Sequence, residues 1–78
     1  MHLEILTPEK KLFEGEITGV KLPGVLGSFE ILKNHAPIIS ALANGEIRVN
    51  GPEGTQNFKI SSGFVEGSNN EITVLIEE

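Results

Sequence analysis

Short apolar runs separated by turn residues constrain this chain more than any other feature. Glycine, proline and the pairs Asn-Gly and Asn-Asn recur at short intervals along the 78 residues. The runs between them are rich in Ile, Val, Leu, Phe and Thr, and none has an apolar stripe of helical spacing. Such a pattern is typical of sandwiches and small barrels. The sequence therefore predicts an all-β fold, a small antiparallel β-sandwich or flattened barrel of about eight to ten short strands.

The expected strands form one domain over residues 1–78, because the chain is too short for two. They cover residues 2–6, 11–22, 26–32, 38–43, 46–50, 56–60, 63–67 and 71–78. In the longest stretch, Ile17 has one parity, whereas Val20 and Leu22 have the other. A bulge or bend near Gly19 is expected to bring all three to one apolar face.

Several expected strands carry apolar side chains on both faces. The pairs are Ile5 with Leu6, Leu12 with Phe13, Phe64 with Val65, and Val74 with Leu75. A two-layer sandwich buries only one face of each sheet. The spare side chains therefore form either a contiguous patch that marks an interaction surface or the scattered apolar exposure that is normal for proteins.

Composition excludes several classes of function. The formal net charge is −5, and the chain has no Tyr or Trp, so neither an anionic nucleic acid nor a base-stacking site is expected. The absence of cysteine excludes disulfides and thiolate metal sites. His2 and His35 lack the spacing of metal ligands. Charged residues interrupt 1–15 and every apolar run is short, so no direct membrane insertion is expected.

His35 is the best catalytic candidate by residue type. A histidine base needs an orienting group and a nucleophile or substrate proton within reach. No nucleophile-elbow spacing surrounds any of the nearby hydroxyls, Ser28, Ser40, Ser61 and Ser62. The alternative is a structural histidine that hydrogen-bonds the backbone of its Asn-His-Ala-Pro loop. The sequence favours this structural role over a small enzyme built around His35.

Gly24 and Gly27 are spaced too closely for a phosphate-binding loop. No Gly-Lys-Ser/Thr follows them, and the third glycine of a dinucleotide loop is absent. Pro23-Gly24 is a turn pair, and Gly27 permits a positive φ. These glycines therefore predict a tight turn, and no cofactor is expected.

Five segments, taken in order, resemble the N-terminal β-sandwich domain of the ε subunit of F-type ATP synthases. They are TPEKKLFEGEITGVKLPG, GSFEILKNHAP, NGEIRV, ISSGFVEG and EITVLIEE, and they cover almost the whole chain. The most specific stretch is LPGVLGSFEILKNHAP, in which a G-x-x-G turn precedes an F-x-I-L strand and an H-A-P loop. The resemblance implies a non-catalytic subunit of the central rotor stalk, held peripherally at the cytoplasmic face of an energy-transducing membrane.

The same resemblance implies two partners, the γ subunit and the polar loops of the membrane c-ring. Loops at one end of the sandwich would face the c-ring: Gly24, Val25, Leu26, Gly27, Ser28 and Phe29, together with Asn34, His35, Ala36 and Pro37. The surface facing γ would involve Thr7, Ser40 and Leu42. Relatives often have a carboxylate in the glycine-rich turn. In this sequence, apolar contacts of Val25 and Leu26 with the c-ring would take the place of that carboxylate's electrostatic contact.

The family usually continues into a helical hairpin that regulates ATP hydrolysis, whereas this sequence stops at Glu78. The resemblance therefore implies that the hairpin's inhibitory and ATP-binding functions are missing. The alternative to a rotor subunit is a stand-alone β-sandwich adaptor that binds another protein.

Overall fold

Nine β-strands account for most of the chain in the computed structural model, which describes all residues from Met1 to Glu78. They are β1 (His2–Leu6), β2 (Lys11–Glu16), β3 (Gly19–Gly24), β4 (Gly27–Leu32), β5 (Ile38–Leu42), β6 (Gly45–Gly51), β7 (Gly54–Ile60), β8 (Ser62–Ser68) and β9 (Glu71–Glu77). The predicted strands are confirmed, except that 11–22 forms two. No helix long and apolar enough to cross a membrane is present.

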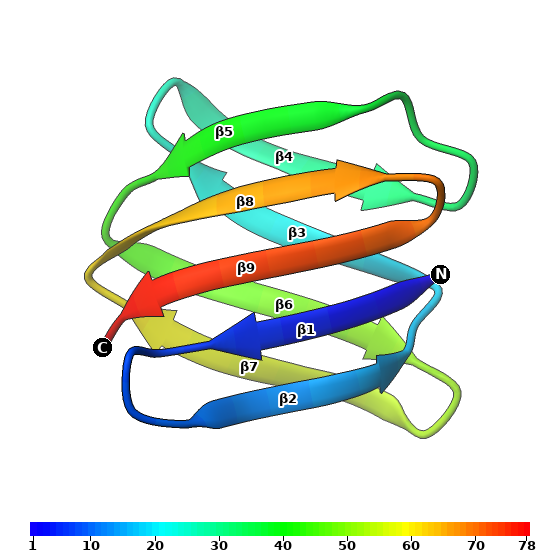
Figure 1. Cartoon of the computed structure of the whole chain (residues 1–78), viewed down its shortest axis with the longest axis horizontal. Coiled ribbons are helices and arrows are strands. Elements are labelled where there is room, and N and C mark those ends of the chain that lie inside the picture. The colour runs from blue at the N-terminus through cyan, green and yellow to red at the C-terminus, as the bar shows by residue number, and fades with distance from the viewer.

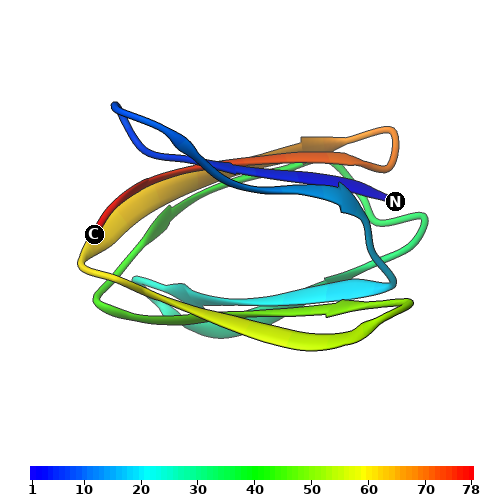
Figure 2. The same ribbon diagram turned by 90° about the horizontal axis from the view of Figure 1, so that it is seen from below.

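One continuous sheet curls into two layers that face each other (Figures 1 and 2). The strand order is β2-β1-β9-β8-β5-β3-β6-β7, and β4 pairs with β3. We call β2-β1-β9-β8-β5 the first layer and β4-β3-β6-β7 the second layer. The layers join where Gly24 of β3 pairs with Leu42 of β5. The predicted all-β sandwich is confirmed.

The first and last strands pair in parallel, from His2 opposite Glu71 to Leu6 opposite Leu75. All other strand pairs are antiparallel. The prediction of a purely antiparallel sheet is therefore incomplete at this one pair. No short turn connects β1 to β9, so local sequence cannot set their relative direction.

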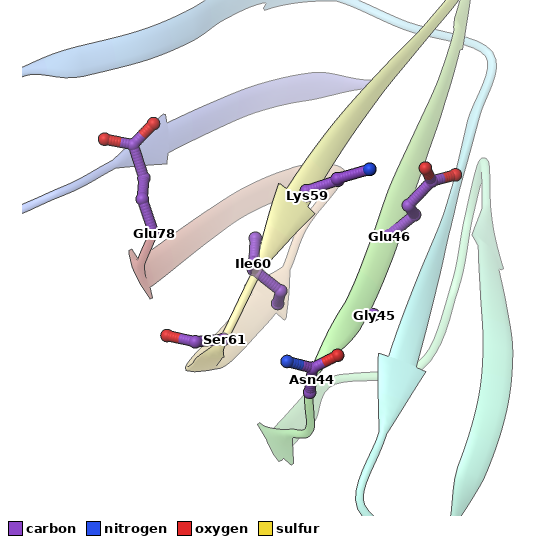
Figure 3. Close-up of a pocket in the computed structure, with 7 residues that line it drawn as sticks. All are labelled: Asn44, Gly45, Glu46, Lys59, Ile60, Ser61 and Glu78. Carbon is purple, nitrogen blue, oxygen red and sulfur yellow. The ribbon is translucent and has the colours of Figure 1, made fainter.

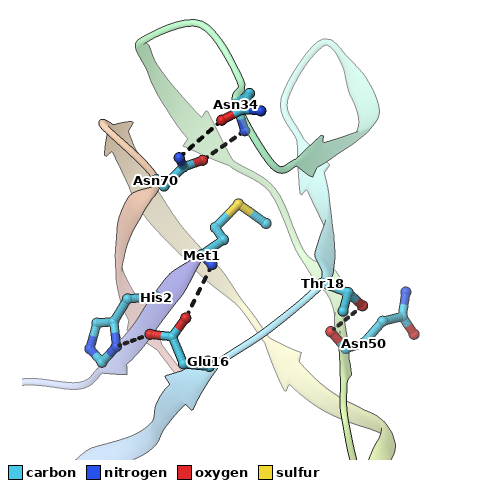
Figure 4. A network of polar contacts seen from close by, with 7 residues as sticks. All are labelled: Met1, His2, Glu16, Thr18, Asn34, Asn50 and Asn70. Atoms are coloured by element: carbon cyan, nitrogen blue, oxygen red, sulfur yellow. Dashed lines mark hydrogen bonds and ion pairs between the residues drawn. The ribbon is translucent and has the colours of Figure 1, made fainter.

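The core lies between the layers and consists only of aliphatic side chains. Its buried residues are Leu3, Ile5, Ile17, Val20, Leu22, Ile31, Leu42, Ile47, Val49, Ile60, Val65, Ile72, Val74 and Ile76. Ile17, Val20 and Leu22 all face it, as expected, because the chain bends at Thr18 and crosses from the first layer to the second. The Thr18 N–H and hydroxyl both donate to the Asn50 carbonyl, at 2.8 and 3.0 Å, and hold this crossing (Figure 4).

The sheet does not close into a complete barrel, because β2 and β7 are its two ends. Phe13 of β2 and Phe58 of β7 meet edge to face, with ring centroids 6.1 Å apart. Such pairs contribute beyond the area that they bury. This aromatic contact therefore connects the two end strands, β2 and β7, which are not hydrogen-bonded to each other.

Charged side chains cross-link β1 and β2 on the outer surface. The Lys11 ammonium lies 2.6 Å from Glu14 and 3.0 Å from Glu4. His2 lies 3.2 Å from Glu14 and 3.4 Å from Glu16, which also accepts a hydrogen bond from the Met1 ammonium (Figure 4). The hydrogen bond between Lys11 and Glu14 raises the pKa of Lys11 and lowers the pKa of Glu14. Bonding to the Met1 ammonium lowers the pKa of Glu16.

The Glu14 carboxylate makes stability depend on pH. A lowered pKa means that the folded state favours the charged form, so its contribution is present above the unfolded pKa and is lost as the pH falls through the folded value. We expect Glu14→Gln to be less stable than the parent at neutral pH, with the difference shrinking below about pH 4. Urea unfolding across this range measures it. Glu46→Gln, outside the cluster, is the control, and a pH-independent difference for Glu14→Gln would contradict the expectation.

Candidate functional site

Four apolar side chains form a row across the outer face of the first layer. The registers place Leu6 beside Leu75, Leu75 beside Phe64, and Phe64 beside Ala41. Phe64 is 62% exposed and Leu75 is 52% exposed. We call Leu6, Ala41, Phe64 and Leu75 the apolar strip. Because they lie side by side, the spare apolar residues form a contiguous patch here rather than scattered exposure.

The apolar strip lies in a groove of about 570 Å³ between the ends of β1, β5, β8 and β9. Thr7, Pro8, Ser62 and Glu77 line the groove as well. The inward neighbours Ile5, Val65 and Val74 are fully buried in the core beneath it. A rigid, hydrogen-bonded sheet therefore presents an uncovered apolar surface, which is a common sign of a protein-binding site.

The residues predicted to face γ occupy three different environments. Thr7 lines the groove, and its hydroxyl accepts hydrogen bonds from the N–H groups of Glu9 and Lys10. Leu42 also borders the groove, but it is only 3% exposed and belongs to the core. Ser40 is half-buried and faces the same side of β5 as Leu42. Ala41 faces the opposite side, and it is therefore the β5 residue that belongs to the apolar strip. Sequence reasoning missed this because β5 is apolar on both faces.

The predicted turn at Gly24 and Gly27 is a two-residue hairpin that joins β3 to β4. Gly24 pairs with Gly27, which has a φ of 127°. The tip residues Val25 and Leu26 are 57% and 100% exposed. The Val25 N–H donates to the Ala41 carbonyl at 3.1 Å. The exposed hairpin tip, Val25 and Leu26, therefore adjoins the apolar strip.

The two loops predicted to face the c-ring lie at opposite ends of strand β4 (Figure 1), so the expectation that they share one end of the sandwich is wrong, whereas their contact with the c-ring stays a prediction. Strand β4 leads directly from the hairpin, on the left in Figure 1, to the loop 34–37, on the right. A six-residue strand extends roughly 20 Å. Side chains Asn34 and Asn70 meet at the far end, where the Asn34 N–H donates to Asn70 Oδ1 at 2.7 Å (Figure 4).

His35 has the structural role that its loop predicts. Its Nδ1 lies 2.8 Å from the Ala36 carbonyl oxygen, which fits a ring N–H that donates to the backbone. Its Nε2 is buried and has no hydrogen-bond partner. The ring packs beside Gly67, where an added Cβ would lie 3.2 Å from His35 Cε1. Neither ring nitrogen hydrogen-bonds a serine or a carboxylate, so the groups of a catalytic histidine are not assembled.

A second hollow, of about 410 Å³, is mostly polar (Figure 3). It is lined by Asn44, Gly45, Glu46, Lys59, Ile60, Ser61 and Glu78. Its one hydroxyl, that of Ser61, donates to the Glu77 carbonyl at 3.0 Å. A serine nucleophile needs an adjacent base instead. The apolar strip is therefore the better candidate site.

A pair of aspartate substitutions separates the buried and exposed positions of β5. We expect Leu42→Asp to destabilise the fold by about 3–5 kcal/mol, because it removes a core side chain and buries a carboxylate. Ala41→Asp is expected to change stability by only about 1 kcal/mol or less, because its side chain faces outward. Urea unfolding measures both, and equal losses of stability would contradict the placement of these side chains.

Comparison with known proteins is consistent along the whole chain. The family model described as ATP synthase, Delta/Epsilon chain, beta-sandwich domain, matches residues 1–78. The ATP synthase epsilon chain of Chlorobaculum tepidum is 43% identical over 97% of this chain and 88% of its own length. The epsilon chain of Caulobacter vibrioides is 36% identical over 99% of this chain and 90% of its own length. The chain covers 58% of the epsilon chain of Nitratidesulfovibrio vulgaris strain DP4, to which it is 40% identical.

Solved structures from two mitochondrial ATP synthases share the fold. A chain from the Tetrahymena thermophila central stalk and c-ring structure has a TM-score of 0.82 at 15% identity and covers 99% of this chain and 63% of that one. A chain from the Euglena gracilis OSCP/F1/c-ring structure has a TM-score of 0.90 at 19% identity. The match covers 97% of this chain and 49% of that one. The family model matches the chain over its whole length, and the epsilon chains of two bacteria are 43% and 36% identical to it. This chain therefore belongs to the ATP synthase delta/epsilon chain family and corresponds to the β-sandwich domain of that family.

Proposed function

We propose that this chain is a non-catalytic rotor subunit of an F-type ATP synthase, which binds the γ subunit and contacts the c-ring. The family match supports the assignment of this chain to the ATP synthase complex. The exposed apolar strip on the sheet is the observation that supports a role in docking to another subunit. As part of the rotor, the chain couples proton-driven rotation of the c-ring to ATP synthesis in the catalytic head. It is held peripherally, through the complex, at the cytoplasmic face of the membrane.

The apolar strip is the γ-binding surface in this proposal. Phe64 and Leu75 provide exposed apolar area at its centre, where an interface gains most of its affinity. Thr7 contacts γ from the edge of the groove. Ser40 and Leu42 act indirectly, because their inward side chains hold Ala41 in place on the outer face.

The β3–β4 hairpin is the c-ring contact in this proposal. Its tip residues Val25 and Leu26 extend from the sheet with no core contact to cover them. Gly24, Gly27, Ser28 and Phe29 shape and support that tip. The loop 34–37 lies at the opposite end of β4, where Asn34 and Asn70 join it to the β8–β9 turn, and in this proposal it supports the fold there.

A rotor contact has to transmit force without deforming. Most backbone hydrogen bonds of this chain join neighbouring strands, and the two layers enclose one aliphatic core. The docking residues of β1, β5, β8 and β9 lie on adjacent strands of that sheet. The sheet therefore carries torque between its two contacts, and the subunit makes and breaks no covalent bond.

Binding to the γ subunit from the same source tests the proposal. We expect one-to-one binding with a submicromolar Kd, roughly −8 kcal/mol or better, by sedimentation and calorimetry. Phe64→Asp is expected to weaken binding by about thirtyfold or more, because it places a charge at the centre of an apolar contact. Leu32→Asp is the matched control, since Leu32 is 55% exposed outside the strip. Equal losses for both variants would exclude the strip, and no binding by the folded parent would exclude the rotor role.

A substitution at the hairpin tip separates the two contacts. We expect Leu26→Asp to keep γ affinity within about twofold, because the side chain is fully exposed beyond the strip. In the reconstituted complex, however, it should lower the rate of proton-driven ATP synthesis, which is the quantity to measure. Asn57→Asp, at an exposed position of β7 away from both contacts, is a control for added charge. Unchanged synthesis by Leu26→Asp would show that the tip is no c-ring contact.

A further inference from the structure

Charge is divided unequally between the two outer faces of the sandwich. Strand parity and register place six glutamates and one lysine on the outer face of the first layer: Glu4, Glu14, Glu16, Glu66, Glu71 and Glu77, with Lys11. The outer face of the second layer carries two glutamates and three cations: Glu30, Glu46, Lys21, Arg48 and Lys59. The acidity of the chain is therefore concentrated on the face that carries the apolar strip.

Carboxylates border the apolar strip on both of its long sides. On one side, Glu4, Thr73 and Glu66 form the next row across β1, β9 and β8. On the other side, Glu77 follows Leu75 by two residues on β9 and lines the same groove. Glu4 is paired with Lys11 at 3.0 Å, whereas Glu66 and Glu77 form no ion pair. Two unneutralised carboxylates therefore flank the strip, one on each side.

The dimensions of the strip match those of a helix laid across the strands. Neighbouring strands are about 4.8 Å apart, so four strands span roughly 14 Å. One turn of α-helix rises about 5.4 Å, so apolar residues at positions i, i+4 and i+7 span about 10.5 Å, or two turns, and meet three successive strands. Side chains on either flank of that apolar stripe would point toward the carboxylate rows.

We propose that the strip receives a basic amphipathic helix, whose apolar stripe packs on Phe64 and Leu75 and whose Lys or Arg side chains face Glu66 and Glu77. This deepens the proposed function and rests on it, because it specifies the chemistry of the γ segment that docks here. The same carboxylates repel an anionic lipid surface, so the occupant is a protein segment. Opposite charges on the two sides steer the association and fix the orientation of the helix.

Charge reversal on the two faces tests the proposal with γ itself. The variant Glu66→Lys/Glu77→Lys reverses both flanking charges, and Glu30→Lys/Glu46→Lys changes the net charge equally on the opposite face. We expect the first to weaken γ binding about tenfold or more and the second to leave it within about twofold. We also expect parent affinity to fall as salt rises from about 0.05 to 0.5 M, and the fall to be smaller for the first variant. Equal effects of the two variants would overturn the proposal.

A synthetic peptide tests the helix inference independently of γ. The probe is a helix-forming peptide with leucines at i, i+4 and i+7 and lysines on both flanks, and its control carries glutamates in place of the lysines. We expect only the lysine peptide to shift the NMR signals of Leu6, Phe64 and Leu75 in the folded chain. Binding of both peptides, or of neither, would overturn the inference. If the lysine peptide binds but γ does not, the inference holds and the proposed γ partner is wrong.

Discussion

The parallel register between β1 and β9 is the interaction on which the rest of the structure depends. It places Leu3 and Ile5 in the core beside Ile72 and Val74, and it aligns Leu6 with Leu75 on the outside. A slip of one residue would turn the buried side chains of β1 to solvent. The same hydrogen bonds therefore set the composition of the core and the continuity of the apolar strip.

The two outer faces of the sandwich have different chemistry, although one core supports both. In the second layer, β6 alternates in the ordinary way, with Ile47 and Val49 inward and Glu46 and Arg48 outward. The first layer departs from that pattern at Phe64 and Leu75. Exposed apolar residues at these points do not contribute to burial within the domain, which is why they point to a partner.

Much of the site was visible in the sequence, since adjacent apolar pairs such as Phe64 with Val65 require one member to face outward. The structural role of His35 was also visible, because an Asn-His-Ala-Pro loop with no nucleophile nearby offers little to catalysis. The loops 24–29 and 34–37 do not share one end of the sandwich as expected. A single extended strand separates them, and its two ends cannot coincide.

The sequence by itself determined the strands, their turns and the excess of apolar residues on some of them, because alternation and turn preference act between near neighbours. Only the tertiary structure decided the parallel pairing of β1 with β9, the inward direction of Ser40 and Leu42, and the gathering of carboxylates on one face. Each of these depends on which distant strands are hydrogen-bonded together and in which register. That choice is made by burying one common core, and no local segment encodes it.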